Sequence, residues 1–188
     1  MQFHLKTTSL AKGSKKQLAY TFIIATQNEQ SQISLDETSL ATLPESIQTT
    51  LRIAIDTNHF NGAAQQQLSL IDAPSQSQFI VIGTGKKSAK TAKTAAQAIT
   101  AYCQQYEIKQ ACVFVDANLD DANALNQFIL GASDCAYVFE SPNGMHTGEL
   151  ALANAKKSAS SAKRALTLMT GKTPSAEQKR QFTQAVAI

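Results

Sequence analysis

Apolar and polar positions alternate along this chain in blocks that predict strands and helices in turn. Short apolar blocks rich in β-branched and aromatic residues predict strands. These blocks are residues 2–7, 18–25, 68–71, 79–82, 111–115 and 164–169. The polar run 27–37 predicts a loop. Longer segments with apolar residues about every 3.6 positions predict helices. These segments begin at Pro44, at Ser88 and after Asn118. Strands that alternate with helices predict an α/β fold, a mixed sheet flanked by helices.

The predicted helices differ in how they approach the sheet. Pro44 suits a first helical turn, where its missing N–H costs nothing, and Glu45 complements the helix dipole. The segment from residue 88 to about 105 presents mainly alanines on its apolar face, so it can approach a sheet closely. The segment 174–188 predicts a further helix with an apolar edge at Phe182, Ala185 and Val186.

Composition places the chain among ordinary single domains. It has 188 residues, of which 43% are hydrophobic. No stretch reaches the roughly 20 apolar residues of a membrane span, and the first residues lack a secretion signal. Cys103, Cys112 and Cys135 lie within apolar runs without CxxC spacing, which favours buried free thiols in a reducing compartment. We therefore expect a cytoplasmic location and no membrane partner.

The most informative segment is residues 60–87. It contains the turn Phe60-Asn61-Gly62, the strand 67–72, and the strand 79–82 followed by Gly83-Thr84-Gly85-Lys86-Lys87. This order and spacing resemble the N-terminal domain of the M17 leucyl aminopeptidases, the cytosol aminopeptidases. Leu130-Gly131 followed by Tyr137 and Phe139 resembles a second block of that family.

The resemblance implies a macrodomain-like α/β fold for residues 1–170. It also implies that residues 171–188 begin a linker helix toward a C-terminal catalytic domain, which would leave the apolar edge of this helix uncovered in the present chain. In the family that second domain removes N-terminal residues from peptides, leucine among them. Two divalent metals, zinc or manganese, polarise the carbonyl and activate a water there. The family assembles as a homohexamer.

The family's catalytic signature, Asn-Thr-Asp-Ala-Glu-Gly-Arg, does not occur in this sequence. No catalytic or metal-ligating residue can therefore be assigned here, and no cofactor is expected in this chain. What the resemblance implies is a non-catalytic domain with a structural or assembly role, whose partners are its own catalytic domain and further copies of itself.

The glycine pair before the lysines invites a phosphate-loop interpretation. A Walker A loop needs an earlier glycine at position 80 and a serine or threonine at position 87, where this chain has isoleucine and lysine. The glycines are therefore expected to turn the chain from strand to helix. ADP-ribose binding, as in true macrodomains, is a further alternative, but this sequence contains no loop that matches their ligand loop.

The basic residues support an alternative function, that of a DNA-binding or regulatory module of a multifunctional aminopeptidase. Lys86, Lys90 and Lys93 are predicted on one face of a helix N-terminus, with Lys87 beside them and no acid between. A further basic segment follows, because residues 151–188 carry seven basic residues and one acidic residue, Lys163 and Arg164 among the basic ones. Lys86, Lys87, Lys90, Lys93, Lys163 and Arg164 are candidate anion- or DNA-binding residues. The alternative explanation is a solvated face that keeps its charges in water.

Overall fold

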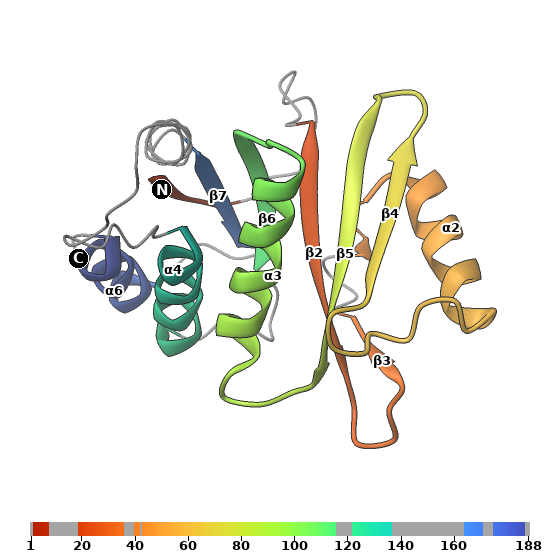
Figure 1. The fold of residues 1–188 in the computed structure, drawn as a ribbon, viewed down its shortest axis with the longest axis horizontal. Coiled ribbons are helices and arrows are strands. Elements are labelled where there is room, and N and C mark those ends of the chain that lie inside the picture. Colours follow the sequence, from red (N-terminus) through yellow and green to blue (C-terminus); the bar gives the residue numbers. More distant parts are fainter. Residues whose placement is uncertain are drawn as a thin grey trace, which may run out of the picture.

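The computed structural model describes residues 2–7, 19–35, 40–41, 43–115, 122–136, 164–170 and 175–186. Within them one seven-stranded sheet runs in the order β1-β7-β6-β2-β5-β4, and the short β3 pairs with β2 (Figure 1). The strands are β1 Gln2–Thr7, β2 Tyr20–Gln27, β3 Ile33–Ser34, β4 Gln67–Asp72, β5 Ser77–Lys86, β6 Gln110–Val115 and β7 Ala165–Thr170. The helices are α2 Glu45–Asp56, α3 Thr91–Gln105, α4 Ala122–Ala136 and α6 Ala176–Val186.

The sheet is mixed but mostly parallel. Strands β1, β7, β6, β2 and β5 all run in one direction. The edge strand β4 is antiparallel to β5, and β3 is antiparallel to β2. The carboxyl ends of the five parallel strands therefore share one edge of the sheet and their amino ends share the opposite edge.

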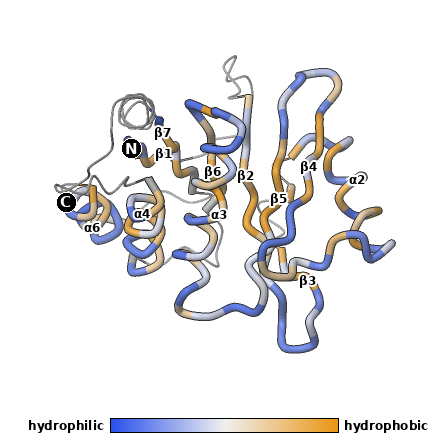
Figure 2. The backbone as a smooth tube through the Cα atoms, in the orientation of Figure 1, coloured by the Kyte–Doolittle hydropathy of each residue, from blue (hydrophilic) through white to orange (hydrophobic). Residues whose placement is uncertain are grey.

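The central strands are apolar on both faces, which explains their continuous apolar runs. Phe22, Ile24, Ile80 and Ile82 belong to one core cluster. Their neighbours Ile23, Ala25, Phe79 and Val81 belong to a second cluster on the other face. Figure 2 shows β2 and β5 as the apolar centre, with the hydrophilic positions gathered in the turns and on the outer helix surfaces.

Helices cover the two faces unequally. Helices α3, α4 and α6 lie on one face, and α2 packs on the other through Ile47 and Leu51 (Figure 1). The alanines of α3, among them Ala92, Ala95 and Ala96, are fully buried. The α3–α4 contact is also close, because a Cβ at Gly131 would lie 2.8 Å from the Lys93 carbonyl oxygen.

The α/β fold with a mixed sheet flanked by helices is confirmed, and so is the helix that follows Pro44. Two boundaries were wrong. The polar segment predicted as a loop contains β3, which pairs Ile33 and Ser34 with the end of β2. Helix α3 begins at Thr91 instead of Ser88. Asn118, Tyr137 and Phe139 lie outside the described residues.

Strand β5 continues to Lys86, so the expectation that Gly83 and Gly85 turn the chain into a helix was wrong. Both glycines lie within the strand, and a loop packs tightly over them. The physical reason for glycine at position 83 is this close approach and not a turn.

Helix α6 packs on this domain. Phe182 and Ala185 lie against the core cluster beneath α4, so the expectation of an uncovered apolar edge was wrong for these two residues. Val186 is 43% exposed and fits that expectation. The division of the chain after residue 170 stays a prediction.

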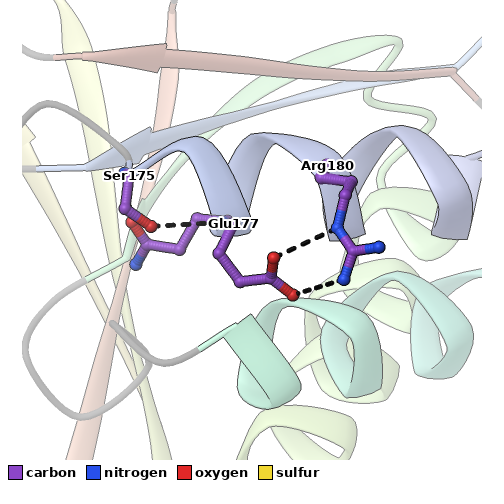
Figure 3. Close-up of polar contacts among 4 residues, drawn as sticks. Ser175, Glu177 and Arg180 are labelled. Carbon is purple, nitrogen blue, oxygen red and sulfur yellow. Dashed lines mark hydrogen bonds and ion pairs between the residues drawn. The ribbon is translucent and has the colours of Figure 1, made fainter.

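A capping box begins α6. The Gln178 backbone N–H donates to Ser175 Oγ at 3.1 Å, and the Ser175 N–H donates to Gln178 Oε1 at 2.7 Å. Figure 3 shows Ser175 at the start of the helix and Arg180 turned back toward Glu177, to which it donates two hydrogen bonds. These local contacts explain why the helix begins where it does.

Candidate functional site

The loop of residues 60–66 lies over the carboxyl end of β5. Phe60 anchors it in the second core cluster at 1% exposure. The Asn61 side chain accepts a hydrogen bond from the Ala63 N–H at 3.1 Å, and the Asn61 N–H donates to Gln66 Oε1 at 3.0 Å. Gly62 has a φ of +76°, a conformation that glycine adopts without strain. The Phe-Asn-Gly motif therefore forms a compact turn.

This turn is bonded directly to β5. The Gly83 N–H donates to the Gln66 carbonyl at 2.7 Å, and the Gly83 carbonyl accepts from the Gln65 N–H at 3.1 Å. The Gly85 N–H donates to the Gly62 carbonyl at 2.9 Å. Because the backbone N–H groups of Gly83 and Gly85 are engaged within the protein, they are not available to a phosphate.

The start of α3 also satisfies part of its own backbone. The Ser88 N–H donates to Thr91 Oγ1 at 2.8 Å, and the Lys90 N–H donates to Ser88 Oγ at 3.3 Å. The first turn carries no acidic residue, so Lys90 and Lys93 oppose the helix dipole.

The lysines lie close along the chain but not on one helix face. Lys86 ends β5, Lys87 follows it, Lys90 occupies the N-cap of α3, and only Lys93 lies within the helix. The predicted single helical face was therefore wrong, because the strand continues four residues further than its apolar run, to Lys86. The first three lysines are exposed at the carboxyl edge of the sheet.

Lys93 has an acidic partner that the local sequence does not reveal. Its Nζ lies 2.9 Å from Asp134 Oδ2 on the neighbouring α4. Both side chains are substantially exposed, so this ion pair contributes little stability, although it gives Lys93 an acidic partner.

Arg164 lies far from these lysines. It immediately precedes β7 and is only 9% exposed, so it stands at the amino edge of the parallel strands. Its charge lies near the Cys103 thiol. The structure does not bring Arg164 together with Lys86, Lys87 and Lys90, and Lys163 lies outside the described residues.

A pocket of about 330 Å³ lies at this amino edge, at residues that sequence reasoning missed. Its lining residues are Tyr20, Ser69, Gln78, Tyr102 and Tyr106. Gln78 Nε2 donates to Ser69 Oγ at 2.8 Å, and the Tyr102 and Tyr106 ring centroids lie 4.4 Å apart. Burial raises the pKa of Tyr102, so its phenol stays neutral at physiological pH.

The remaining reactive groups are structural. Burial raises the pKa of Cys103 to about 12, which makes this thiol unreactive near neutral pH. Cys103 and Cys112 are buried as predicted, while Cys135 is partly exposed. Among the described residues, no group of three or more His, Cys, Asp or Glu side chains could hold a metal ion. In the same part of the chain, no helix is long and apolar enough to cross a membrane.

A profile of the cytosol aminopeptidase family, N-terminal domain, matches residues 24–142. The chain belongs to this family. The matched range includes the turn at Gly62, β5 and the first lysines, the segment on which the resemblance was based. A search of the curated proteins finds no match.

Two solved structures share the fold of this chain. A mutant of tomato leucine aminopeptidase superimposes with a TM-score of 0.61 at 15% identity, covering 98% of this chain and 35% of that protein. The bottromycin maturation enzyme BotP in complex with Mn superimposes with a TM-score of 0.50 at 12% identity, covering 90% of this chain and 29% of that enzyme. The chain therefore spans about a third of the length of these two proteins. At these identities the likeness shows the fold alone.

Proposed function

We propose that this chain is a non-catalytic domain of a metal-dependent leucyl aminopeptidase and that its role is structural, in positioning the catalytic domain and in assembly. The observation that carries the proposal is the match of the N-terminal domain profile to residues 24–142. The coverage of only 35% of the tomato leucine aminopeptidase structure agrees with it. The family activity, release of N-terminal residues from peptides, would belong to a region outside this sequence.

The chemistry of the described residues supports a structural role. The backbone groups around Gly83 and Gly85 bond within the protein. Cys103 is an unreactive thiol, and the described side chains form no metal-ligand group. The two divalent metals, zinc or manganese, would therefore be held elsewhere in a complete aminopeptidase. A homohexamer and a cytoplasmic location remain part of the same proposal.

The two halves of the proposal need separate tests. The purified chain, assayed on leucine p-nitroanilide with added Mn²⁺ or Zn²⁺, is expected to show no turnover. Activity that co-purifies with the chain and is lost on chelation would refute the non-catalytic role.

The coding sequence beyond Ile188 tests the other half. We expect the reading frame to continue into a segment with the Asn-Thr-Asp-Ala-Glu-Gly-Arg signature, and the longer protein to hydrolyse the same substrate. A reading frame that stops at Ile188 would contradict the role as one domain of a peptidase.

A further inference from the structure

The tyrosine pocket, lined by Tyr20, Ser69, Gln78, Tyr102 and Tyr106, combines aromatic walls with a lining that carries no charge. Three of its five lining residues are tyrosines, which come from the start of β2 and the end of α3. Its volume of about 330 Å³ lies at the lower end of the range for small-molecule sites. The pocket therefore suits a small ligand or one compact group of a larger ligand.

The aromatic walls are fixed before any ligand binds. Tyr102 is buried, and its ring meets the fully buried Phe22 ring edge to face, with 5.5 Å between the centroids. The Tyr106 ring lies against Tyr102 and is 56% exposed. One ring is thus held in the core and another stands at the surface. The pocket therefore offers aromatic surface without rearrangement of the core.

The polar groups of the pocket are neutral and bond to one another. Gln78 Nε2 donates to Ser69 Oγ, and Tyr102 shares a side-chain hydrogen bond with Ser69. Burial raises the pKa of Tyr102, and the nearby Tyr106 and Tyr20 phenols add to that rise. Tyr102 therefore presents a neutral ring at physiological pH, and none of the five lining side chains is a carboxylate.

The electrostatics of the pocket favour a cation over an anion. The face of an aromatic ring carries partial negative charge. The pocket also lies at the carboxyl end of α3, where the helix dipole is negative, and the last turn of this helix contains no basic residue. The charged residue nearest to the lining along the chain is the exposed Glu107, which directly follows Tyr106. All three features attract positive charge.

The kind of cation follows from hydration. A primary ammonium is strongly hydrated, and in this pocket it would lose water without gaining a carboxylate, which is costly. A quaternary ammonium holds water weakly, and aromatic cages are its usual binding sites in proteins. We propose that the pocket binds a trimethylammonium group, the cation of choline and of trimethyllysine, between Tyr20, Tyr102 and Tyr106. This site is independent of the structural role proposed above.

The test is a titration of the purified chain with choline chloride, followed by tyrosine fluorescence. The chain has no tryptophan and four tyrosines, and three of these line the pocket, so the emission reports mainly on the pocket. We expect a saturable change with a Kd of about 1 mM. Sodium chloride at the same concentrations should leave the emission unchanged. The absence of a saturable change up to about 50 mM choline would overturn the proposal.

A neutral analogue separates cation binding from simple filling of an apolar hollow. In the carbon analogue of choline a tert-butyl group replaces the trimethylammonium group, so the shape is kept and the charge is lost. It should bind at least about tenfold more weakly than choline, because the rings attract the charge. Equal affinities of choline and this analogue would refute the aromatic cage.

Substitution of Tyr106 tests the contribution of the ring at a position that is largely exposed. Tyr106→Leu keeps an apolar side chain but removes the ring, and it should weaken choline binding at least about fivefold. Tyr106→Phe is the matched control, because it keeps the ring and should bind choline within about twofold of the wild type. Since each variant loses one reporter tyrosine, binding is also followed by the NMR signal of the choline methyl groups. Wild-type affinity in Tyr106→Leu would contradict the proposed site.

The same group can reach the pocket from two sources. Choline presents it as a free compound, and trimethyllysine amide presents it as the side chain of a modified peptide. Tighter binding of either probe supports the site and identifies its source. Failure of both probes to bind would overturn the proposal, whatever the peptidase assay of the longer protein shows.

Discussion

Among the described glycines, Gly83 is the one at which an added Cβ would lie closest to neighbouring atoms, so an alanine there should destabilise the fold. A Cβ there would lie well inside van der Waals contact of the Ala63 carbonyl oxygen and 2.8 Å from the Gly62 carbonyl carbon. Both neighbours are backbone atoms of the 60–66 loop, so no flexible side chain can move aside. Gly83→Ala therefore forces the whole loop away from β5.

The cost follows from the contacts that this displacement disturbs. Overpacking in a well-packed region costs about 1 to 3 kcal/mol. The loop also loses two backbone hydrogen bonds at Gly83, from its N–H to Gln66 and from Gln65 to its carbonyl, each worth about 0.5 to 1.5 kcal/mol net. Alanine recovers up to about 1 kcal/mol in a strand relative to glycine. We expect a net destabilisation of about 2 to 5 kcal/mol, a large fraction of the stability of a domain.

Urea denaturation followed by circular dichroism measures this cost. Gly85→Ala is the comparator, because Gly85 has a φ of +74° and its added Cβ would lie 3.3 Å from the Ala64 side chain, so the cost there is mainly conformational, about 1 kcal/mol. Gly83→Ala should be clearly the worse of the two. A loss below about 0.5 kcal/mol for Gly83→Ala, the level of an ordinary surface substitution, would refute the close approach of loop and strand.

Three further outcomes follow from the described contacts. Phe182→Ala should lower the free energy of unfolding by about 1 to 3 kcal/mol in urea denaturation, because the Phe182 ring packs on the core. Val186→Ala, at a 43% exposed position, should change it by about 0.5 kcal/mol or less. Equal small effects of the two substitutions would mean that α6 does not pack on this domain. Hydrogen bonds from Ser75 and Ser46 lower the pKa of Asp72 below its ordinary value of 3.8. The ionised Asp72 therefore stabilises the fold above pH 3.8, and this contribution is lost as the pH falls through the lower pKa of the folded state. Asp72→Asn should flatten the acid side of the stability–pH curve, and an unchanged curve would contradict this. Duplex DNA should bind no more tightly than about 10⁻⁴ M at physiological salt, and charge reversal at Lys86 and Lys90 should leave the salt dependence of binding unchanged, since three of the candidate basic residues share an exposed edge in the described part of the chain. A steep salt dependence that these reversals abolish would favour the DNA-binding alternative.

The sequence predicts the centre of this fold well because its signals are local. The runs in β2 and β5 are apolar on both faces, and the spacing of Ile47 and Leu51 in α2 is that of a helix with one buried side. Strand β3 escapes detection because it has only two residues in a polar segment and exists through its pairing with β2. The start of α3 is displaced because Lys86 continues β5 beyond its apolar run.

The candidate site was harder to predict because its determinants are tertiary. Lys93 forms an ion pair with Asp134 on another helix, and Arg164 is buried at the edge of the sheet opposite to Lys86, Lys87 and Lys90. Nothing in the spacing of these residues along the chain indicates either arrangement. The five residues of the tyrosine pocket come from β2, β4, β5, α3 and the residue after α3. The strand order of the sheet and the packing of α3 on it bring them together.

The family motif and the absence of a phosphate site have one physical cause. Gly83 is required because the 60–66 loop approaches β5 too closely for a Cβ, Gly62 and Gly85 are required by their positive φ, and the loop and the strand make their hydrogen bonds to each other. A motif of this kind specifies packing, so it identifies a fold without specifying any chemistry. This explains how the segment 60–87 can point to an aminopeptidase family although the backbone N–H groups of Gly83 and Gly85 are not available to a phosphate. The function of such a domain has to be sought on surfaces that the motif leaves free.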